Sequence, residues 1–259
     1  MQQTALITGA SSGMGKDFAH LLAQRGFDVV LVARSADVLE QVAADIRATY
    51  KVQADVLPFD LSKPESADQL VAELAKRSIA ITTLINNAGF ATYGEFAQID
   101  WKQQQSLIAL NITCLTHLTR LLLPPMITQK RGYILNVAST AAFQPGPLLA
   151  TYYASKSYVL SFSVALRQEV LGTGVHVTTL CPGPTKTGFE HRAGLEVSKL
   201  FRGGVMASLP VAEAGIHGLM TNRAVVIPGF RNRLVSFAQR FTSYAFAARV
   251  VQRMQEKQA

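Results

Sequence analysis

A tyrosine and a lysine in this chain have the residue types and the spacing that a carbonyl reduction requires. Tyr152 and Lys156 are four residues apart in the stretch YYASK, so a helix there places both side chains on one face. An isolated phenol titrates at about pH 10, and a neighbouring ammonium group favours its ionised form. Tyr153 lies three residues before Lys156, so helix geometry alone permits either tyrosine as the proton donor.

A serine could hold the oxygen of the substrate. Ser139 directly follows the apolar run 132–138, which predicts a strand, and lies thirteen residues before Tyr152. In a parallel α/β sheet, ligands bind beyond the carboxyl ends of the strands, so this hydroxyl would face the ligand crevice. By itself, the tyrosine–lysine pair is more typical of an amphipathic helix with packed tyrosines, but the turn described next favours a catalytic site.

Three glycines mark a turn between the first predicted strand (4–8) and a predicted helix (13–25). Gly9, Gly13 and Gly15 have the spacing G-x-x-x-G-x-G. Glycines let the backbone turn sharply and approach a pyrophosphate, and the start of the helix offers free N–H groups to phosphates. The alternative is a tight turn without a ligand. Three glycines in seven residues cost backbone entropy without improving packing, so we favour a dinucleotide site.

The end of the second predicted strand (27–33) distinguishes between the two nicotinamide cofactors. NAD sites carry an acidic residue there, whereas this strand is followed by Arg34, 19 residues after Gly15, and by Ser35. A guanidinium suits a 2′-phosphate by charge and by bidentate geometry, and Ser35 and Ser11 could add hydrogen bonds. An ordinary basic residue is disfavoured at the start of a helix. The sequence therefore predicts NADP(H).

The remaining elements alternate between strands and helices. Further strands are expected at 52–59, 83–85, 132–138, 175–180 and 224–228. Further helices are expected at 38–50, 64–77 (with Ser62 as a possible N-cap), 101–123 (ended by Pro124 and Pro125) and 151–171. Such alternation predicts an α/β fold with a doubly wound parallel sheet of about seven strands, flanked by helices.

Composition is typical of one globular domain. The 259 residues are 49% hydrophobic, which is enough for a sizeable core. Cys114 and Cys181 each stand in an apolar run, which favours buried small side chains over a disulfide and fits a reducing compartment. The N-terminus lacks the pattern of a signal peptide, and no apolar run reaches about 18 uninterrupted residues. We therefore expect a cytoplasmic protein that is not integral to a membrane.

The net charge of +8 is concentrated near the C-terminus. Up to Thr185 there are 14 basic and 13 acidic residues, and from Lys186 onward there are 11 basic and four acidic residues. Segment 231–257 interleaves arginines with apolar residues and is expected to be amphipathic and helical. It could lie on an anionic membrane surface, but packing on the body or against a second subunit is favoured. The basic residues are too dispersed to indicate nucleic-acid binding.

Residues 188–209 break the alternation of strands and helices. We expect an insertion beside the end of the strand at 175–180, with the role of a substrate lid. Its apolar side chains indicate an apolar substrate, unless they pack on the body or at a subunit interface.

The motifs together resemble the short-chain dehydrogenase/reductase family, in its NADP-preferring form. They occur in the family's order and spacing over about the first 190 residues: TGASSGMG (Thr8–Gly15), NNAG (Asn86–Gly89), Asn111, Ser139, YYASK (Tyr152–Lys156) and PGPTKT (Pro182–Thr187). The resemblance implies a single-domain Rossmann fold over residues 1–259, an enzyme acting on a CH–OH group, and a homodimer or homotetramer. It implies no metal.

The resemblance also implies a role for each catalytic residue. Tyr152, rather than Tyr153, would exchange a proton with the carbonyl or alcohol oxygen. Lys156 would lower the pKa of Tyr152 and hold the nicotinamide ribose, and Ser139 would orient the substrate oxygen. Asn111 would hold a water that links Lys156 to solvent as a proton relay.

Cofactor contacts follow from the glycine turn, Arg34 and the resemblance. They are Gly9, Ser11, Ser12, Gly13, Met14, Gly15, Arg34, Ser35, Asp60, Leu61, Asn87, Ala88, Gly89, Tyr152, Lys156, Pro182, Gly183, Thr185 and Thr187. For Asn86 and Asn87, a structural role in the central sheet is an open alternative. Some NADP-preferring members carry a basic residue where this chain has Ser12, so Arg34 alone would discriminate less completely.

Three functions are consistent with these features. The first is an NADP(H)-dependent oxidoreductase acting on an apolar carbonyl or alcohol. The second is a non-catalytic NADP-sensing protein, which would not need Asn111, Ser139, Tyr152 and Lys156 together. The third is a lipid ketone reductase that works at a membrane surface.

Overall fold

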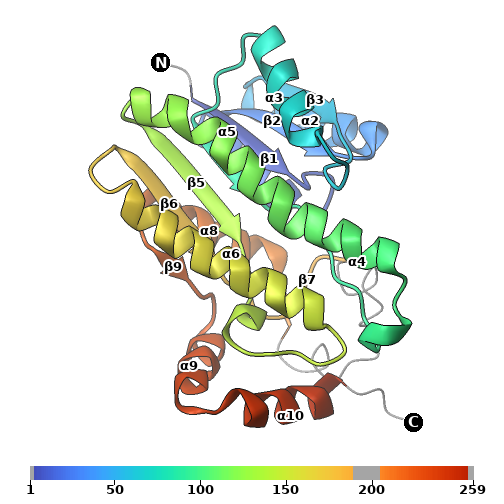
Figure 1. The fold of residues 1–259 in the computed structure, drawn as a ribbon. Coiled ribbons are helices and arrows are strands. Elements are labelled where there is room, and N and C mark those ends of the chain that lie inside the picture. Colours follow the sequence, from blue (N-terminus) through green and yellow to red (C-terminus); the bar gives the residue numbers. More distant parts are fainter. Residues whose placement is uncertain (1–2, 189–204, 256–259) are drawn as a thin grey trace.

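A seven-stranded parallel sheet forms the centre of the computed structural model, which describes residues 3–188 and 205–255 (Figure 1). The strand order is β3-β2-β1-β4-β5-β6-β9, so it reverses between β1 and β4 and confirms the doubly wound prediction. The strands are β1 (Thr4–Thr8), β2 (Asp28–Ala33), β3 (Ala54–Pro58), β4 (Thr83–Asn86), β5 (Gly132–Val137), β6 (Val175–Leu180) and β9 (Val225–Val226).

Helices cover both faces of the sheet. One layer contains α1 (Gly13–Ala23), α2 (Ala36–Tyr50) and α8 (Ser208–Met220), and the other contains α3 (Ser66–Lys76), α5 (Leu115–Thr128) and α6 (Ala150–Glu169). Neighbouring strand residues point to opposite faces of the sheet. Ile7 packs in the layer of α1, α2 and α8, and Leu6 packs in the layer of α3, α5 and α6; both are fully buried. This two-sided burial explains the continuous apolar runs of the strands.

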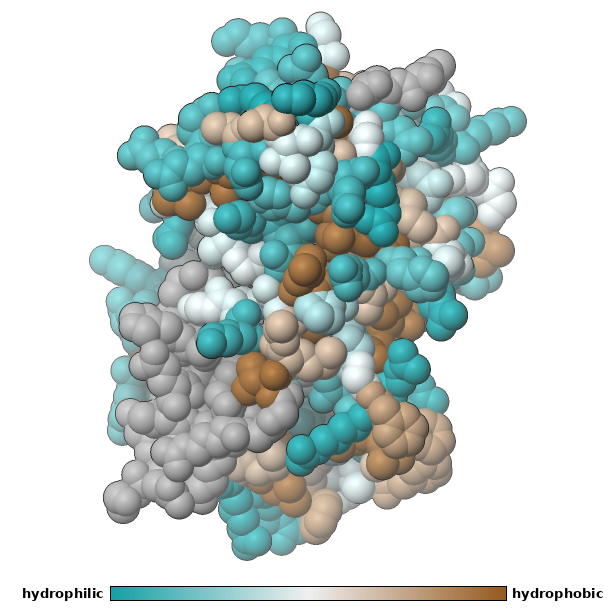
Figure 2. Space-filling model, turned by 180° about the vertical axis from the view of Figure 1, so that it is seen from behind, coloured by the Kyte–Doolittle hydropathy of each residue, from teal (hydrophilic) through white to brown (hydrophobic). Residues whose placement is uncertain are grey.

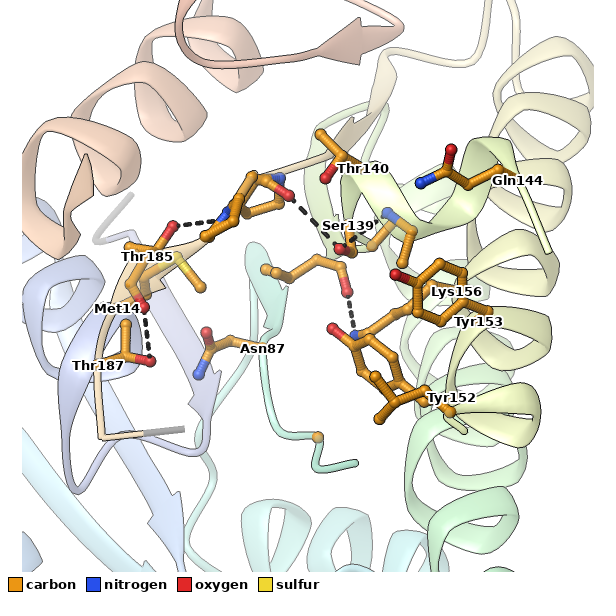
Figure 3. Close-up of a pocket in the computed structure, with 18 of the residues that line it drawn as sticks. Met14, Asn87, Ser139, Thr140, Gln144, Tyr152, Tyr153, Lys156, Thr185 and Thr187 are labelled. Atoms are coloured by element: carbon orange, nitrogen blue, oxygen red, sulfur yellow. Dashed lines mark hydrogen bonds between the residues drawn. The ribbon is translucent and has the colours of Figure 1, made fainter. Parts of the chain in front are cut away.

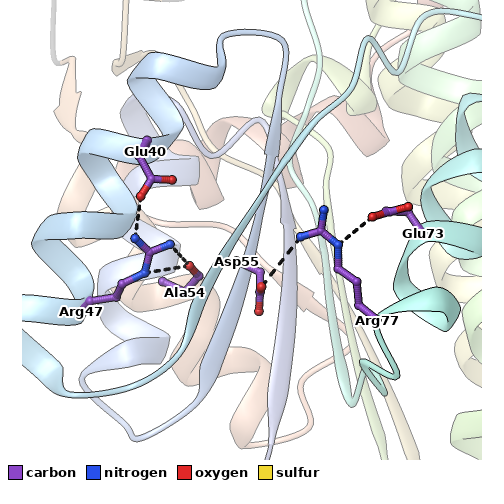
Figure 4. Close-up of polar contacts among 6 residues, drawn as sticks. All are labelled: Glu40, Arg47, Ala54, Asp55, Glu73 and Arg77. Carbon is purple, nitrogen blue, oxygen red and sulfur yellow. Dashed lines mark hydrogen bonds and ion pairs between the residues drawn. The ribbon is translucent and has the colours of Figure 1, made fainter.

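Arginines hold the edge strand β3 from both sides (Figure 4). Arg47 of α2 donates from Nε to the carbonyl oxygen of Ala54 at 3.0 Å and also pairs with Glu40. Arg77, directly after α3, pairs with Glu73 at 2.7 Å and lies 3.9 Å from Asp55. Part of this edge is therefore occupied by cationic side chains, which disfavour pairing with another strand.

A chain of buried amides and hydroxyls joins the central strands. Asn86 at the end of β4 donates from Nδ2 to Asn136 Oδ1 at 2.8 Å and to Thr119 Oγ1 at 3.0 Å. Asn136 of β5 donates in turn to Ser163 Oγ at 2.9 Å. Asn86 and Asn136 thus both find buried partners, and Asn86 fulfils the structural role considered for this motif.

Two expected helix boundaries are wrong. Pro124 and Pro125 lie inside α5, which continues to Thr128 because Met126 beyond them is buried in the core. Ser62 is not a cap: its hydroxyl bonds to Asp60 at 2.6 Å, and the helix starts at Ser66 after Glu65 in a left-handed conformation. Core packing at Met126 and a local hydrogen bond at Ser62 outweighed the usual boundary signals.

The helix that leads into α5 has an irregular middle. α4 (Trp101–Ile108) passes through a π-helical turn, Ala109–Cys114, into α5 without a break. By length and composition alone, the continuous helix Trp101–Thr128 could cross a membrane. Here Leu107, Leu118 and Leu122 are buried in the packed structure, as in the core helix of a domain.

The C-terminal part contains elements that the sequence analysis did not resolve. Segment 231–257 forms two helices, α9 (Phe230–Ala238) and α10 (Tyr244–Gln255), joined by a 3₁₀ turn. Of the expected lid, residues 189–204 lie outside the described residues. The last residues of the expected lid (188–209) form β8 (Met206–Ala207) and the start of α8. β8 pairs with β7 (Thr185–Lys186).

The two cysteines are buried and free, as expected. Cys114 lies at the end of the π-helical turn and Cys181 directly after β6. Burial raises the pKa of both thiols, to about 11 for Cys114 and about 12 for Cys181, so neither is a reactive thiolate near neutral pH.

Candidate active site

Tyr152, Ser139 and Lys156 meet at one wall of a cleft beyond the carboxyl ends of the strands (Figure 3). α6 carries Tyr152 and Lys156 on one face, with the Lys156 ammonium 5.8 Å from the centre of the tyrosine ring. Lys156 donates from Nζ to the carbonyl oxygen of Val137 at 2.8 Å, which ties the helix to the end of β5. Ser139 follows β5 and contributes its hydroxyl from the same strand end.

The structure distinguishes between the two adjacent tyrosines. The Tyr152 hydroxyl is hydrogen-bonded to Ser139. The Tyr153 hydroxyl instead accepts a hydrogen bond from Gln255 Nε2 at 2.7 Å. Only Tyr152 therefore combines the serine contact with the lysine contact, a choice that spacing alone left open.

Burial shifts the titration of the tyrosine and the lysine in opposite directions. It raises the pKa of Tyr152 to about 12, partly offset by the hydrogen bond from Ser139. It lowers the pKa of Lys156 to about 8. Near neutral pH the phenol therefore holds its proton and the lysine is charged, which is the combination needed for a proton donor whose phenolate is then stabilised.

Asn111 lies in the π-helical turn and is fixed by three hydrogen bonds. Its Nδ2 donates to the carbonyl oxygen of Phe90 at 3.0 Å and to Ser155 Oγ at 3.1 Å, and its Oδ1 accepts from Phe90 N at 3.2 Å. A Cβ on Gly89 would lie 3.1 Å from Asn111 Oδ1 and 3.5 Å from Lys156 Nζ. Gly89 thus leaves the space in which Asn111 and Lys156 approach each other.

The glycine turn has the shape of a phosphate cradle. Gly9 and Gly13 have positive φ angles of 69° and 53°, and a Cβ on Gly15 would lie only 2.0 Å from the carbonyl oxygen of Gly9. Ser12, which precedes α1, makes no side-chain cap, so its hydroxyl does not occupy the first N–H groups of the helix. This open helix start fits a pyrophosphate. Ser11 and Met14 belong to the same turn, and Met14 lines the cleft.

Thr8 and Asn87 join the ends of β1 and β4 beneath this cradle. Thr8 Oγ1 accepts from the backbone N of Asn87 and of Ala88, each at 3.0 Å. Asn87 donates from Nδ2 to the carbonyl oxygen of Thr8 at 2.9 Å. Thr8 is part of the first motif but is not among the predicted site residues.

Arg34 lies where a 2′-phosphate would be expected. It is exposed and directly follows β2, and within the described residues its guanidinium makes no ion pair. Ser35 precedes α2 with its hydroxyl free of a capping bond. Burial tends to raise the pKa of Asp60, but hydrogen bonds from Ser62 and the nearby Arg34 lower it overall. Leu61 is buried in the core.

The other wall of the cleft comes from the segment after β6. Pro182, Gly183, Thr185 and Thr187 line it, and Thr187 packs against Gly13. In Figure 3 this wall faces Tyr152 and Lys156 across the opening, which holds about 940 Å³ of empty space, part of it open to solvent. Eight further lining residues were not predicted: Val137, Ala138, Thr140, Ala141, Gln144, Leu149, Pro184 and Gln255.

A comparison with known proteins now decides the family. The family profile described as short chain dehydrogenase matches residues 3–197. The chain belongs to the short-chain dehydrogenase family. Proteins similar to it are named as reductases and dehydrogenases, and one of them was solved in complex with NADPH.

Similar proteins include reductases. A very-long-chain 3-oxoacyl-CoA reductase of Phaeosphaeria nodorum is 38% identical over 67% of this chain and 52% of its own length. The ketoacyl reductase HetN of Nostoc sp. is 34% identical over 87% of this chain and 78% of its own length. A short-chain dehydrogenase from Sphingobium yanoikuyae, solved with NADPH, is 33% identical over 92% of this chain and 94% of its own, with a TM-score of 0.83. The chain spans about half the length of the first curated relatives.

The pKa of Lys156 generates a prediction for activity as a function of pH. Reduction should lose rate as the pH rises through about 8, because the ammonium that stabilises the Tyr152 phenolate loses its proton. In Lys156→Arg, whose guanidinium stays charged, this alkaline decline should be absent from the pH profile of kcat/KM, even if the rate is lower. The exposed Lys102→Arg is the control. A decline at the same pH in Lys156→Arg would contradict the assignment.

Proposed function

We propose that this dehydrogenase is an NADP(H)-dependent oxidoreductase that transfers a hydride between the nicotinamide and an apolar carbonyl or secondary alcohol. The observation that carries the proposal is the Tyr152 hydroxyl bonded to Ser139, with the buried Lys156 ammonium beside the ring. A non-catalytic NADP sensor would have no use for this arrangement.

Proton transfer follows from the positions of these side chains. When bound, the nicotinamide supplies or accepts the hydride. Ser139 donates a hydrogen bond to the carbonyl oxygen and holds it beside Tyr152. Tyr152 gives its hydroxyl proton to that oxygen as negative charge develops there, and Lys156 stabilises the resulting phenolate. Asn111, fixed in the π-helical turn, positions the route by which a proton returns from solvent.

The substrate is an apolar acyl ketone in this proposal. Met14, Leu149 and Pro184 line the cleft around the reacting group, and apolar surface is exposed there more than polar surface. The names of the similar proteins describe 3-oxoacyl-CoA and ketoacyl reductases. A β-keto thioester joins a reducible carbonyl to an apolar chain, which matches this lining. An NADP site favours the direction of reduction.

Replacing the proposed acid tests the function. Tyr152→Phe keeps the ring and its packing but removes the proton, so NADPH-dependent reduction of β-keto thioesters should fall at least about a hundredfold. NADPH binding, followed by fluorescence, should stay nearly unchanged. A fully active Tyr152→Phe would refute the proposed acid, and wild-type protein that binds NADPH but oxidises it with no ketone or aldehyde would favour the sensor.

The NADP preference rests on Arg34. Arg34→Ala should weaken NADPH binding by about 10- to 100-fold, because a charge-assisted bond to the 2′-phosphate is lost, and should leave NADH binding almost unchanged. Arg120→Ala, which removes an exposed arginine on α5, is the control. Dissociation constants for both cofactors decide the matter: equal losses for NADPH and NADH would refute the preference.

A membrane-surface reductase is the second candidate, supported by the exposed face of α9 and α10. Side chains from Phe230, Phe241 and Tyr244 are about three-quarters or more exposed. Residues 230–255 contain five arginines and no acidic residue. In Figure 2, brown side chains gather with teal ones at the end of the molecule where α9 lies. Two such cationic faces would repel each other, so this surface suits an anionic bilayer better than a second copy.

Vesicle binding distinguishes the two uses of this face. The protein should co-sediment with phosphatidylserine-containing vesicles at low salt and less with pure phosphatidylcholine vesicles. The double variant Arg231→Glu/Arg240→Glu should lose binding, whereas Arg120→Glu should keep it. If neither vesicle binds the protein, the membrane proposal fails. If the double variant instead dissociates an oligomer, the face is a subunit interface.

The remaining expectations form part of the same proposal. The buried free thiols of Cys114 and Cys181 support a reducing compartment such as the cytoplasm. Assembly as a homodimer or homotetramer is expected of this family and would use a surface other than the cationic face. Residues 188–209 keep their proposed role as a substrate lid.

A further inference from the structure

Gln255, the last residue of α10, reaches into the substrate cleft. Its side chain lines the cleft with Tyr152 and Tyr153, and the whole residue is buried. In the sequence it is 102 residues from Tyr153, so only the return of the C-terminal helix brings the two together.

Several contacts fix the position of this glutamine. Its side-chain Nε2 donates to the Tyr153 hydroxyl at 2.7 Å, and its backbone carbonyl oxygen accepts from the Tyr93 hydroxyl at 2.6 Å. One helical turn earlier, Val251 is buried in a small apolar cluster with Tyr153 and Leu149. Tyr153 is itself held tightly, because a Cβ on Gly146 would lie 2.4 Å from its ring.

Within the part of the chain that the structure describes, one atom of this fixed amide has no partner. Gln255 Oε1 is buried and accepts no hydrogen bond from residues 3–188 or 205–255. Leaving a buried amide oxygen unpaired is unfavourable, and such groups are rare in folded proteins. At the wall of a substrate cleft, the cost disappears when a bound ligand supplies a donor. The oxygen is an acceptor only, so the ligand group must be a hydrogen-bond donor, and in an uncharged apolar substrate a hydroxyl or an amide N–H supplies it.

We propose that Gln255 Oε1 is a specificity subsite that accepts a hydrogen bond from the substrate at a group other than the reacting carbonyl. This inference rests on the proposed reductase function and narrows its substrate class. The preferred substrates are apolar ketones that carry a hydroxyl or an amide N–H away from the carbonyl that Tyr152 protonates. The cleft then recognises two polar groups of the substrate, the carbonyl at Tyr152 and the donor at Gln255 Oε1, which are separated by an apolar chain or ring system.

Matched substrates test the subsite and separate the two sources of the donor. One pair is the β-ketodecanoyl thioester of N-acetylcysteamine, which carries an amide N–H, and the corresponding hexyl thioester, which does not. The other pair is a ketosteroid with a hydroxyl on the ring farthest from its carbonyl and the same ketosteroid without it. In at least one pair, the donor-bearing member should have a kcat/KM roughly tenfold higher, as expected for one recovered hydrogen bond.

Variants of one helix turn identify the residue responsible. Gln255→Met keeps the length of the side chain but removes the acceptor, so the preference should fall to near one. Gln255→Glu keeps an acceptor and should retain the preference. Gln252→Met makes the same chemical change on the exposed side of α10 and should behave as wild type. The ratio within a pair is the readout, so a general loss of rate does not imitate the effect.

Binding measurements separate this inference from the function on which it rests. Calorimetry with the NADPH-loaded Tyr152→Phe variant measures the affinity for each pair without turnover. Discrimination in binding without turnover by the wild type would support the subsite and refute the reductase. Turnover without discrimination would support the reductase and overturn the subsite. Equal affinity within both pairs, or no binding of any of the four compounds, also overturns it.

Discussion

The burial of one charged group, the Lys156 ammonium, determines much of the site around it. Lys156 is 6% exposed, and its Nζ donates to the carbonyl oxygen of Val137. A buried ammonium needs such an acceptor, and the same bond ties α6 to the end of β5. Ser139 lies two residues after that strand end, so the bond also sets the distance at which Tyr152 meets Ser139. Gly89 must remain without a side chain because the space beside it is occupied by Lys156 and Asn111.

The strand ends form a rigid floor because short polar side chains connect them. Thr8 and Asn87 join β1 to β4, and Asn86 and Asn136 join β4 to β5. Each of these groups is buried or partly buried, and each satisfies a backbone or side-chain partner. The two asparagines of the NNAG motif therefore have different roles. Asn86 forms hydrogen bonds within the sheet, while Asn87 also lines the cleft. The glycine turn of the proposed cofactor site is therefore anchored to strand ends by hydrogen bonds, which hold its backbone in a defined position.

The C-terminal helices present two different chemical surfaces. Inward, Gln255 lines the cleft and Val251 packs in an apolar cluster with Tyr153. Outward, aromatic side chains and arginines are exposed on the same two helices. An apolar substrate held at a membrane surface would thus lie near the element that forms part of its binding site. This proximity links the proposed substrate class to the proposed location of the enzyme.

Much of the fold was predictable because its signals are local. The strands are apolar runs buried on both faces, so each stands out without its neighbours, and the expected strand at 175–180 has the observed bounds. The helix α8 was missed, since Gly215 and Gly218 weaken its local signal. Those glycines permit close packing: a Cβ on Gly218 would lie 2.2 Å from Val226. The helix is stabilised by a contact that no short window of sequence contains.

The sequence by itself determined the fold class and the residue types of the candidate site, because both depend on short patterns: apolar runs, a glycine turn and the tyrosine–lysine spacing. Only the tertiary structure decided which tyrosine faces Ser139, since Tyr152 and Tyr153 both satisfy helical spacing and differ in what lies opposite. It alone revealed Gln255, whose partners Tyr93 and Tyr153 are more than one hundred residues away. Such contacts depend on how the chain returns to the sheet, and spacing along the sequence carries no record of that path.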